Sequence, residues 1–400
     1  MRWRSRLVGS EGELHLGCTA RAEGLPARVH AMKNTQFRVA VIKGDGIGVD
    51  VTDATLAVID AAERRVGNLS LGYDFLDAGA AYFQANGRDM APGAEDAAEA
   101  ADAIFLGAIG LPSVRHEDGT EIAPHLRLRE TCQLYAGVRP VKDYPNAPQR
   151  LADERAAGID LIILRESTEG LFYSAAAHNR SEVIGDQEVR ETMRITRATT
   201  EKLHDFAFRL ARKRKARGGK GHVTCVDKAN VFRAMAFFRK IFDERAENFP
   251  DIEHSYNHVD AQALDLIRKP WEFDVLVMEN MFGDILSDLA GGLVGGMGMA
   301  SCAEIGDAHG LFQSAHGSAP DIMGQDKANP LASILSGALM LDYLAERSGL
   351  EVHADAARLI DAAIETGFEA NRLRPMEFGG DQGTAAITRE IVSLVEELRL

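Results

Sequence analysis

The chain has 400 residues, of which 46% are hydrophobic and 26% are charged, and its formal net charge at pH 7 is −15. This composition is typical of a soluble globular protein, and the length predicts two domains or one unusually large sheet. The negative charge disfavours nucleic acids and anionic membranes as partners, because both are negatively charged themselves. It does not exclude a small acidic substrate, since a local group of arginines can bind an anion whatever the overall charge.

The N-terminal segment, residues 1–35, precedes the first predicted strand. Its first 31 residues contain five arginines but also three glutamates, and they lack the apolar stretch of a secretory signal. A transit peptide would contain fewer acidic residues. Met32 and the residues after it lead directly into a strand pattern, as a natural start would. We therefore expect residues 1–35 to be a disordered extension or a mis-assigned start.

The four cysteines, Cys18, Cys132, Cys225 and Cys302, are far apart and form no C-x-x-C pair. This spacing indicates neither a disulfide framework nor a zinc site, and it fits a reducing cytoplasm. The longest charge-free apolar stretch, residues 289–303, is too short and too rich in glycine to span a bilayer. We expect a cytoplasmic protein without a membrane segment.

From residue 36 onward, short β-branched runs alternate with longer amphipathic runs, which predicts an α/β protein. Length and composition predict strands over residues 37–42, 103–107, 161–164, 223–226 and 275–278. The predicted helices cover residues 51–65, 188–217 and 330–347. A glycine-rich turn, residues 44–48, joins the first strand to the first helix. Its third glycine comes one residue too early for the dinucleotide fingerprint G-x-G-x-x-G, so we interpret it as a tight strand-to-helix turn.

Two carboxylates stand four residues apart in the segment that follows the strand 275–278. In a helix, Asp284 and Asp288 project from one face about one turn apart. Two such charges repel each other in a bare helix, but a hard cation between them reverses the effect, because Mg²⁺ and Mn²⁺ prefer carboxylate oxygens. Asp260 lies upstream as a third candidate ligand. A divalent metal site is favoured over a pair of solvated aspartates.

Three arginines are candidates for substrate binding. Arg129 and Arg139 flank one short segment, and Arg165 follows the buried strand 161–164, where open α/β sheets bind their ligands. Guanidinium groups bind carboxylates in a bidentate manner, so three of them suit a dicarboxylic acid. The alternative for each arginine is an ion pair with a neighbour such as Glu130 or Glu166.

Lys228 comes directly after another short apolar strand. Nearby cations would disfavour its ammonium form, which suits a general base; the alternative is a surface lysine. Residues 314–330 form a long run of turn-forming residues that is too specific for a plain surface loop. Its small residues let a flat ligand approach the backbone, and Asp321 is placed to accept hydrogen bonds from a ribose diol.

Taken together, these segments resemble the β-decarboxylating dehydrogenase family, which includes isopropylmalate, isocitrate, homoisocitrate, tartrate and D-malate dehydrogenases. The resemblance runs in family order over about residues 36–390. The matching segments are residues 44–48, 129–140, 165–170, 226–230, 259–261, 283–288, 316–321 and 328–330. It implies an isopropylmalate dehydrogenase-like fold, with a large mixed twisted sheet flanked by helices and an active-site cleft between two domains.

The resemblance also implies domain boundaries. Domain 1, which binds the cofactor, is expected to combine residues 36–134 with residues 295–400. Domain 2, residues 135–294, is expected to carry dimerisation and the substrate and metal site.

The resemblance assigns roles to the candidate residues. Asp284 and Asp288 of one subunit, with Asp260 of its dimer partner, would hold Mg²⁺ or Mn²⁺ against the 2-hydroxyl of a 2-hydroxy dicarboxylic acid. Lys228, also from the partner, would take the hydroxyl proton while hydride passes to the nicotinamide, and Asp260 would assist catalysis. The metal would then stabilise the enolate that forms as CO₂ departs. The implied enzyme is a homodimer with shared active sites, and the carboxylates would be bound by Arg129, Arg139 and Arg165.

The expected cofactor is NAD. After the sequence His-Gly-Ser-Ala-Pro, NAD-dependent members resemble this chain in having Asp-Ile, whereas NADP-dependent members have a lysine and a tyrosine. Asp321 would bond the ribose 2′-hydroxyl and repel a 2′-phosphate. The cofactor contacts implied in this way are His316, Gly317, Ala319, Asp321, Ile322, Asn329 and Asn230.

One departure from the family concerns the acid that protonates the enol. The family usually has a tyrosine seven residues after the arginine that matches Arg165, but this chain has Phe172 there and Tyr173 one residue later. On a strand, Tyr173 would face the opposite side. Either the local backbone is shifted so that Tyr173 acts as a catalytic residue, or another group donates the proton.

A second departure concerns the substrate. Isocitrate enzymes tend to have a serine where this chain has Ala123, and some homoisocitrate enzymes have an arginine where it has Leu126. Leu126 and His125 are expected to line the pocket for the 3-substituent, with Ile122 as a further candidate. The pocket has no obvious second cation unless His125 or Arg127 supplies it. This pattern favours a (2R,3S)-3-substituted malate such as 3-isopropylmalate.

Other activities stay open. The alternatives within the family are a decarboxylating tartrate or D-malate dehydrogenase and an NAD-isocitrate dehydrogenase, which the glycine-rich run 291–296 resembles. A silent regulatory subunit would lose a metal-site aspartate or the lysine, and this chain retains them all. A metal-dependent hydrolase would not need the segment 314–330.

Overall fold

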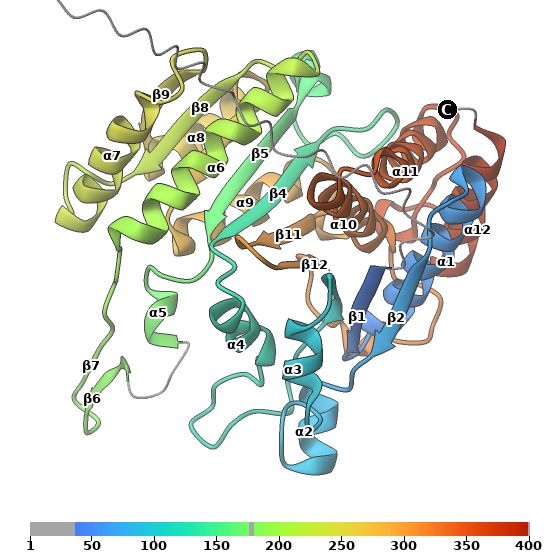
Figure 1. The fold of residues 1–400 in the computed structure, drawn as a ribbon, viewed down its shortest axis with the longest axis horizontal. Coiled ribbons are helices and arrows are strands. Elements are labelled where there is room, and N and C mark those ends of the chain that lie inside the picture. Colours follow the sequence, from blue (N-terminus) through green and yellow to red (C-terminus); the bar gives the residue numbers. More distant parts are fainter. Residues whose placement is uncertain (1–36, 176–179, 399–400) are drawn as a thin grey trace, which may run out of the picture. The chain divides into compact units, whose positions relative to one another are not determined.

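A ten-stranded mixed sheet runs through the protein, whose computed structural model describes residues 37–175 and 180–398 (Figure 1). The expectations for residues 1–35 and Cys18 lie outside the described residues. From one edge to the other, the strands are β2 (Leu71–Phe75), β1 (Phe37–Gly44), β3 (Ala103–Ala108), β12 (Gly310–Ser314), β11 (Ser301–Ile305), β4 (Ala136–Lys142), β5 (Asp160–Glu166), β10 (Val275–Met278), β8 (His222–Asp227) and β9 (Glu253–His258).

The centre of the sheet is antiparallel and its two flanks are parallel. β11 pairs in antiparallel fashion with both β12 and β4, and β4 pairs likewise with β5. Among the flanking strands, β3 and β10 are short apolar runs buried on both faces, as expected for parallel strands covered by helices, whereas the edge strand β9 is polar and more exposed. The predicted large mixed sheet flanked by helices is therefore confirmed.

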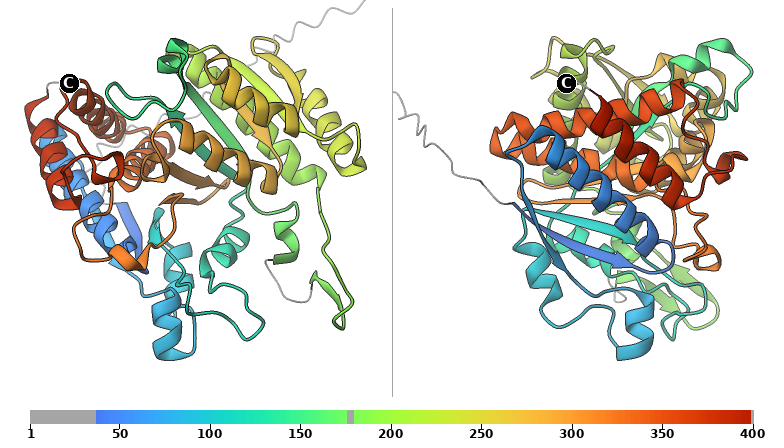
Figure 2. Two further views of the ribbon diagram at one scale, coloured as in Figure 1. Left: turned by 180° about the vertical axis from the view of Figure 1, so that it is seen from behind. Right: turned by 90° about the vertical axis from the view of Figure 1, so that its right-hand side faces the viewer.

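Helices cover both faces of the sheet, as the front view of Figure 1 and the rear view of Figure 2 show. On β5, Ile162 and Leu164 belong to the apolar core formed with α6 (Arg197–Ala216), whereas Leu161 and Ile163 belong to the core formed with α8 (Val259–Arg268) and α9 (Asn280–Leu293). Arg165 therefore continues the face that points toward α9. The helices are α1 (Gly48–Val66), α2 (Ala80–Asn86), α3 (Ala94–Glu99), α4 (Pro124–Thr131), α5 (Phe172–Ala175), α6 (Arg197–Ala216), α7 (Arg233–Ala246), α8 (Val259–Arg268), α9 (Asn280–Leu293), α10 (Leu331–Ser348), α11 (Glu351–Glu369) and α12 (Thr384–Glu397).

The strands of the two predicted domains occupy two halves of the same sheet. β2, β1, β3, β12 and β11 come from residues 36–134 and 295–400, and β4, β5, β10, β8 and β9 come from residues 135–294. The halves are joined where β11 pairs with β4 through three residue pairs, Ala303 with Val138, Glu304 with Gly137 and Ile305 with Ala136. The division into domains stays a prediction.

The helix predicted over residues 188–217 is wrong at its start. A two-stranded hairpin of β6 (Glu182–Ile184) and β7 (Glu188–Arg190) comes first, and α6 begins only at Arg197. The β-branched residues Thr192, Ile195 and Thr196 favour extended backbone, which outweighs the helical spacing of the apolar residues there.

Two findings bear on the compartment. In the part of the chain that the structure describes, no helix is both long enough and apolar enough to cross a bilayer. Cys132, Cys225 and Cys302 are free thiols in buried positions.

Candidate active site

The predicted aspartate pair lies on α9, directly after strand β10. Glu279 caps this helix, because its carboxylate accepts hydrogen bonds from the backbone N–H groups of Met281 (3.1 Å) and Phe282 (3.2 Å). Asp284 and Asp288 are one turn apart, with side chains 40% and 59% exposed. The helical placement of the pair is confirmed, and both carboxylates are accessible to a ligand.

Arg165, at the end of β5, is held against the first turns of α9. Its Nε and Nη2 atoms donate to Oδ1 of Asn280 at 2.8 and 2.7 Å, and its Nη1 donates to Asp284. Gly283 makes this packing possible, because a Cβ at that position would lie 2.6 Å from Cβ of Arg165. The glycine in the Gly-Asp-Ile-Leu sequence therefore brings the helix and the arginine together.

The other two arginines share this site. Nη1 of Arg139 donates to Oγ of Ser287 at 2.7 Å and lies 3.6 Å from Asp288, while its Nη2 lies 3.5 Å from Asp284. Nη2 of Arg129 lies 2.8 Å from Oε1 of Glu304, a residue that the sequence did not single out.

The ion pairs considered from the sequence are not the ones formed. Glu130 pairs with Arg180 instead. Glu166 accepts hydrogen bonds from the Thr168 N–H and hydroxyl and from the Glu169 N–H. The nearest acidic neighbours in sequence are thus engaged elsewhere.

Three buried guanidinium groups in one place affect each other. Burial lowers the pKa of Arg165 to about 10, and the like charges of Arg139 and Arg129 contribute, although Asp284 opposes them. Burial also raises the pKa of Asp288 above its usual value. A carboxylate bound beside these arginines would relieve the repulsion among them.

A cavity of about 940 Å³ connects the arginines, the aspartate pair and the segment after β12. Its walls also include the start of α4, the turn that precedes it and the first residue of α5. Among the residues considered for the site, those that line it are Arg129, Arg139, Arg165, Asp284, Asp288, His125, Leu126, Arg127, Phe172, His316 and Gly317.

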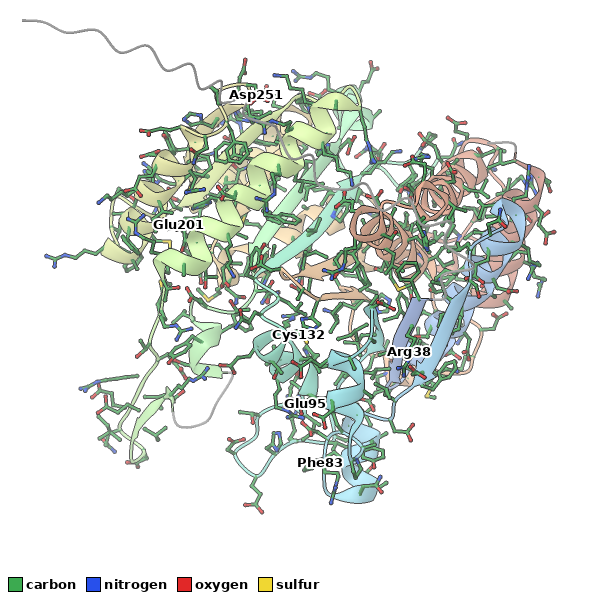
Figure 3. All side chains as sticks on the ribbon, in the orientation of Figure 1. Arg38, Phe83, Glu95, Cys132, Glu201 and Asp251 are labelled. Carbon is green, nitrogen blue, oxygen red and sulfur yellow. The ribbon has the colours of Figure 1, made fainter. Side chains whose placement is uncertain are left out.

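Helix α4 supplies the side chains expected at the 3-substituent. Burial lowers the pKa of His125 to about 3, with the Arg129 charge contributing, so its imidazole is neutral. Arg127, considered as a second cation, donates to Asp89 and to Glu95, which is labelled in Figure 3. Ile122 packs in a separate small core with Ala80 and Val114, so it does not line the cavity as proposed.

Lys228 and Asp260 lie beside each other but not in this cavity. Nζ of Lys228 donates to Oδ1 of Asp260 at 2.5 Å, and this hydrogen bond lowers the pKa of Asp260. Within the described residues of one chain, no group of three His, Cys, Asp or Glu side chains is placed to hold a metal ion. The expected ligand set of Asp260, Asp284 and Asp288 is therefore not assembled by one chain alone.

The predicted cofactor segment begins directly after β12. Burial lowers the pKa of His316, and its Nε2 atom is buried with no hydrogen-bond partner among the described residues. Asn329 is buried and donates to Glu377 at 2.9 Å. Ala319 adopts a left-handed backbone conformation (φ 32°), Ile322 packs beside Ile47, and Asp321 is exposed.

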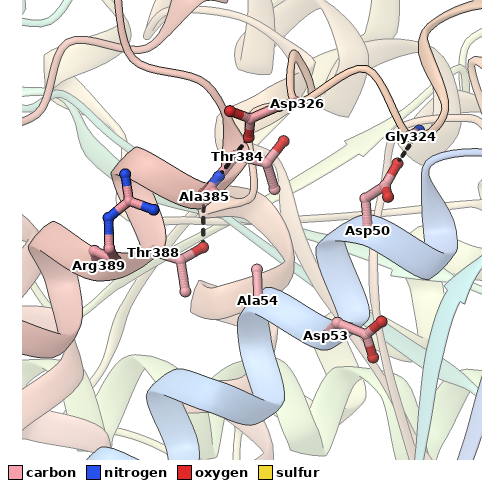
Figure 4. Close-up of a pocket in the computed structure, with 9 residues that line it drawn as sticks. All are labelled: Asp50, Asp53, Ala54, Gly324, Asp326, Thr384, Ala385, Thr388 and Arg389. Atoms are coloured by element: carbon pink, nitrogen blue, oxygen red, sulfur yellow. Dashed lines mark hydrogen bonds between the residues drawn. The ribbon is translucent and has the colours of Figure 1, made fainter.

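The loop that follows Asp321 lines a second pocket, shown in Figure 4, and is hydrogen-bonded to the helices on either side of it. Asp50 on α1 accepts a hydrogen bond from the Gly324 N–H at 2.9 Å, and Asp326 accepts one from the Ala385 N–H of α12 at 2.7 Å. Asp321 is therefore presented by a loop with a defined conformation.

Asn230 is not brought to this segment within one chain. It is exposed in the loop after β8, beside Lys228. Four strands separate β8 from β12 in the sheet, which corresponds to about 24 Å at the usual strand spacing.

The family model described as isocitrate/isopropylmalate dehydrogenase matches residues 38–395 of this chain. The chain belongs to this family. The 3-isopropylmalate/3-methylmalate dehydrogenase of Methanocaldococcus jannaschii is 38% identical over 361 residues, which cover 90% of this chain and 99% of that protein. The 3-isopropylmalate dehydrogenase of Moorella thermoacetica is 39% identical over 335 residues, covering 82% and 89%.

Solved structures agree with this membership. Isocitrate dehydrogenase from Methylococcus capsulatus has 33% identity and a TM-score of 0.77, covering 90% of this chain and 100% of that one. The β-decarboxylating dehydrogenase from Thermococcus kodakarensis, in its apo form, has 33% identity and a TM-score of 0.71, covering 90% and 96%. The resemblance inferred from the motifs is confirmed, and the protein is an oxidoreductase, a decarboxylating dehydrogenase of the isocitrate/isopropylmalate dehydrogenase family.

The tyrosine position of this dehydrogenase differs from the expectation. Phe172 and Tyr173 begin the short helix α5 and are not on a strand. The Phe172 ring lies beneath the Arg165 guanidinium, 4.8 Å from its Cζ, and lines the cavity. The Tyr173 ring lies between the guanidinium groups of Arg180 (4.4 Å) and Arg194 (3.9 Å) and is not part of the cavity wall. Within one chain Tyr173 does not line the cavity, and its role as a proton donor stays a prediction.

Sequence reasoning missed three residues of the dehydrogenase site. Asn280 orients Arg165, Ser287 orients Arg139, and Glu304 pairs with Arg129. The only available signal for Glu304 was a charged residue within the otherwise uncharged Ser-Cys-Ala-Glu-Ile sequence of β11. Such a residue in a buried strand indicates a charged partner.

Proposed function

We propose that the protein catalyses the oxidative decarboxylation of a (2R,3S)-3-substituted malate, 3-isopropylmalate or a close analogue, with NAD as hydride acceptor and Mg²⁺ or Mn²⁺ as the metal. The observation that carries this proposal is the cavity that connects three buried arginines with the Asp284–Asp288 pair and with the His316 segment. The groups proposed to bind the substrate carboxylates, the cation and the cofactor therefore face one cavity.

The metal proposal rests on the chemistry of the donor groups. Asp284 and Asp288 offer carboxylate oxygens from successive turns of a helix, which fit a hard divalent cation. A third carboxylate, Asp260, would come from a partner subunit. Bound there, the cation would supply Lewis-acid polarisation of the substrate 2-oxygen. The arginines would fix both carboxylates, and Lys228 of the partner subunit would accept the hydroxyl proton at its Nζ atom.

A homodimer with shared sites is part of the proposal. Leu264 (54% exposed) and Ile267 (45%) lie on α8 near Asp260, and Ile285 (59%) is next to Asp284 on α9. Leu264 is one turn after Asp260 on the same face of the helix. Large exposed apolar side chains beside two metal-ligand candidates support a subunit contact at this place.

Leu264→Glu is expected to shift the protein toward the monomer, because it buries a charge in the proposed contact. NAD reduction should fall with the dimer fraction, since a monomer lacks the partner's lysine. Light scattering measures the dimer fraction and NADH absorbance measures turnover. Phe75→Glu, at another exposed apolar residue, is the control that should stay dimeric. A fully active Leu264→Glu monomer would contradict the shared site.

Asp321 is proposed to set the preference for NAD. Asp321→Asn removes the charge that would repel a 2′-phosphate, so discrimination against NADP should fall by about tenfold. The measurement is the ratio of kcat/KM for NAD to that for NADP. Asp53→Asn, at an exposed aspartate on α1, should leave this ratio unchanged. An unchanged ratio in Asp321→Asn would remove Asp321 from cofactor selection.

The substrate is tested by NAD reduction with Mn²⁺ and a panel of 3-isopropylmalate, D-malate, tartrate, isocitrate and homoisocitrate. Leu126 in the cavity wall supports an apolar 3-substituent, so 3-isopropylmalate should give the highest kcat/KM. Highest turnover with isocitrate, as named for the Methylococcus capsulatus neighbour, would instead indicate an isocitrate dehydrogenase; tartrate or D-malate is the other alternative. The cytoplasmic location stays a prediction.

A further inference from the structure

The carboxylate of Glu304 is fully buried and lies behind Arg129, which lines the cavity. Glu304 on β11 faces Gly137 on β4, which in turn faces Arg165 on β5, so the three form one row across the sheet. Gly137 leaves room for the acid, because a Cβ there would lie 2.9 Å from Oε2 of Glu304. Glu304 itself is 0% exposed.

Glu304 is surrounded by the three substrate arginines. Its Oε1 atom lies 2.8 Å from Nη2 of Arg129. Burial alone would raise the pKa of Glu304, but the charges of Arg129, Arg139 and Arg165 outweigh burial and hold this pKa below its usual value. The carboxylate is therefore ionised, and it neutralises part of the charge that the arginines present to a ligand.

The charges of the buried group formed by the three arginines and Glu304 can be counted. Arg129, Arg139 and Arg165 contribute three positive charges, and Glu304 is the one acid among them that is fully buried. Asp284 and Asp288 are partly exposed on α9 and are assigned above to a divalent cation. Three positive charges and one negative charge leave a net +2, which matches a substrate with two carboxylates and leaves a third carboxylate unmatched.

We propose that Glu304 determines substrate selection by charge: it offsets one guanidinium, so that the pocket accepts a dicarboxylate and disfavours a tricarboxylate. This inference rests on the proposed function in taking a malate-type acid as the substrate. Glu304 acts through the arginines as a positioning residue and does not contact the substrate. A purely structural ion pair would give the same geometry, so the test must measure selectivity.

The first test is Glu304→Gln, which removes the charge and keeps the size. The affinity for isocitrate relative to 3-isopropylmalate should rise by about tenfold, because the pocket then has a net +3. Titration calorimetry with and without Mg²⁺ measures both affinities, and the kcat/KM ratio gives a second value. An unchanged selectivity in a folded Glu304→Gln protein would overturn the inference.

A reciprocal variant keeps the inference testable if Glu304→Gln does not fold. Gln313 on β12 lies opposite Cys302 and thus on the same face as Glu304; it lines the cavity and is 9% exposed. Gln313→Glu lowers the net charge to +1, so selectivity should move further toward 3-isopropylmalate. The combined variant, Glu304→Gln with Gln313→Glu, restores +2 and should restore the selectivity. Failure of both shifts would overturn the inference.

Two controls separate charge from stability. Glu304→Asp keeps the charge and should keep the selectivity. Asp274→Asn removes another buried acid, paired with Arg214 at the far end of β10, and should lower Tm without changing the selectivity. If the unmodified protein turns over no 3-substituted malate, the proposed function fails, whereas the calorimetric selectivities still decide the role of Glu304.

Discussion

Asp284→Asn is expected to lower kcat/KM with Mn²⁺ by about a thousandfold, which corresponds to the loss of about 4 kcal/mol of transition-state stabilisation. Asp284 contacts two of the arginines and is one turn from the second aspartate: it accepts a hydrogen bond from Arg165, lies 3.5 Å from Nη2 of Arg139 and precedes Asp288 on α9. The asparagine keeps the size of the side chain but is a much weaker ligand for a hard cation. NADH formation at varied Mn²⁺ measures the effect.

The fold should survive this substitution. Arg165 retains two hydrogen bonds to Asn280, and Glu279 still caps α9. Circular dichroism and Tm check this expectation. Asp60→Asn, on the exposed side of α1, is the matched control and should leave turnover unchanged. An Asp284→Asn protein that remains fully active with Mn²⁺ would show that the metal assignment is wrong.

Lys228→Met is expected to reduce kcat by about a thousandfold, because it removes the proposed proton acceptor. The shared site gives a sharper test. When inactive Lys228→Met and Asp284→Asn proteins are mixed and allowed to exchange subunits, half of the dimers are mixed. Each mixed dimer then has one site with both residues intact, so about a quarter of the normal activity should return.

This recovery separates shared sites from sites within one chain. If Lys228 and Asp284 of the same chain formed a site, every site in the mixture would lack one of them and no activity would return. Mixing Lys228→Met with Asp260→Asn is the control, because Lys228 and Asp260 are hydrogen-bonded within one chain and would reach each site together from the same partner. Every site in this mixture therefore lacks one of the two residues, and no activity should return.

Much of the fold could be predicted because several of its strands are buried on both faces. The runs at 161–164 and 275–278 are apolar without interruption, the run at 223–226 contains one threonine, and each proved to be a strand of the sheet. The aspartate pair could be placed on a helix because the strand pattern before it is so clear. These are local signals, and they depend on hydrophobicity and length alone.

The central strands could not be predicted in this way. β4 contains Arg139 and Pro140, and β11 is a short polar sequence after a glycine-rich run, so neither is apolar enough to be recognised as buried. The partner of Arg129 could not be predicted either. Glu304 is 175 residues away in sequence and reaches Arg129 only through the pairing of β11 with β4. Sequence proximity favoured Glu130 instead.

The short pairing between β11 and β4 makes the site sensitive to chain length. Side chains alternate between the faces of a strand, so a slip of β11 by one residue against β4 would carry Glu304 from the cavity face to the opposite core. The arginines would then lose their buried counter-charge, and the carboxylate of Glu304 would be buried among apolar side chains. A deletion of one residue in β11 is therefore expected to disturb the site more than most substitutions there. The charge balance of the pocket depends on the register of this strand as much as on the identity of its residues.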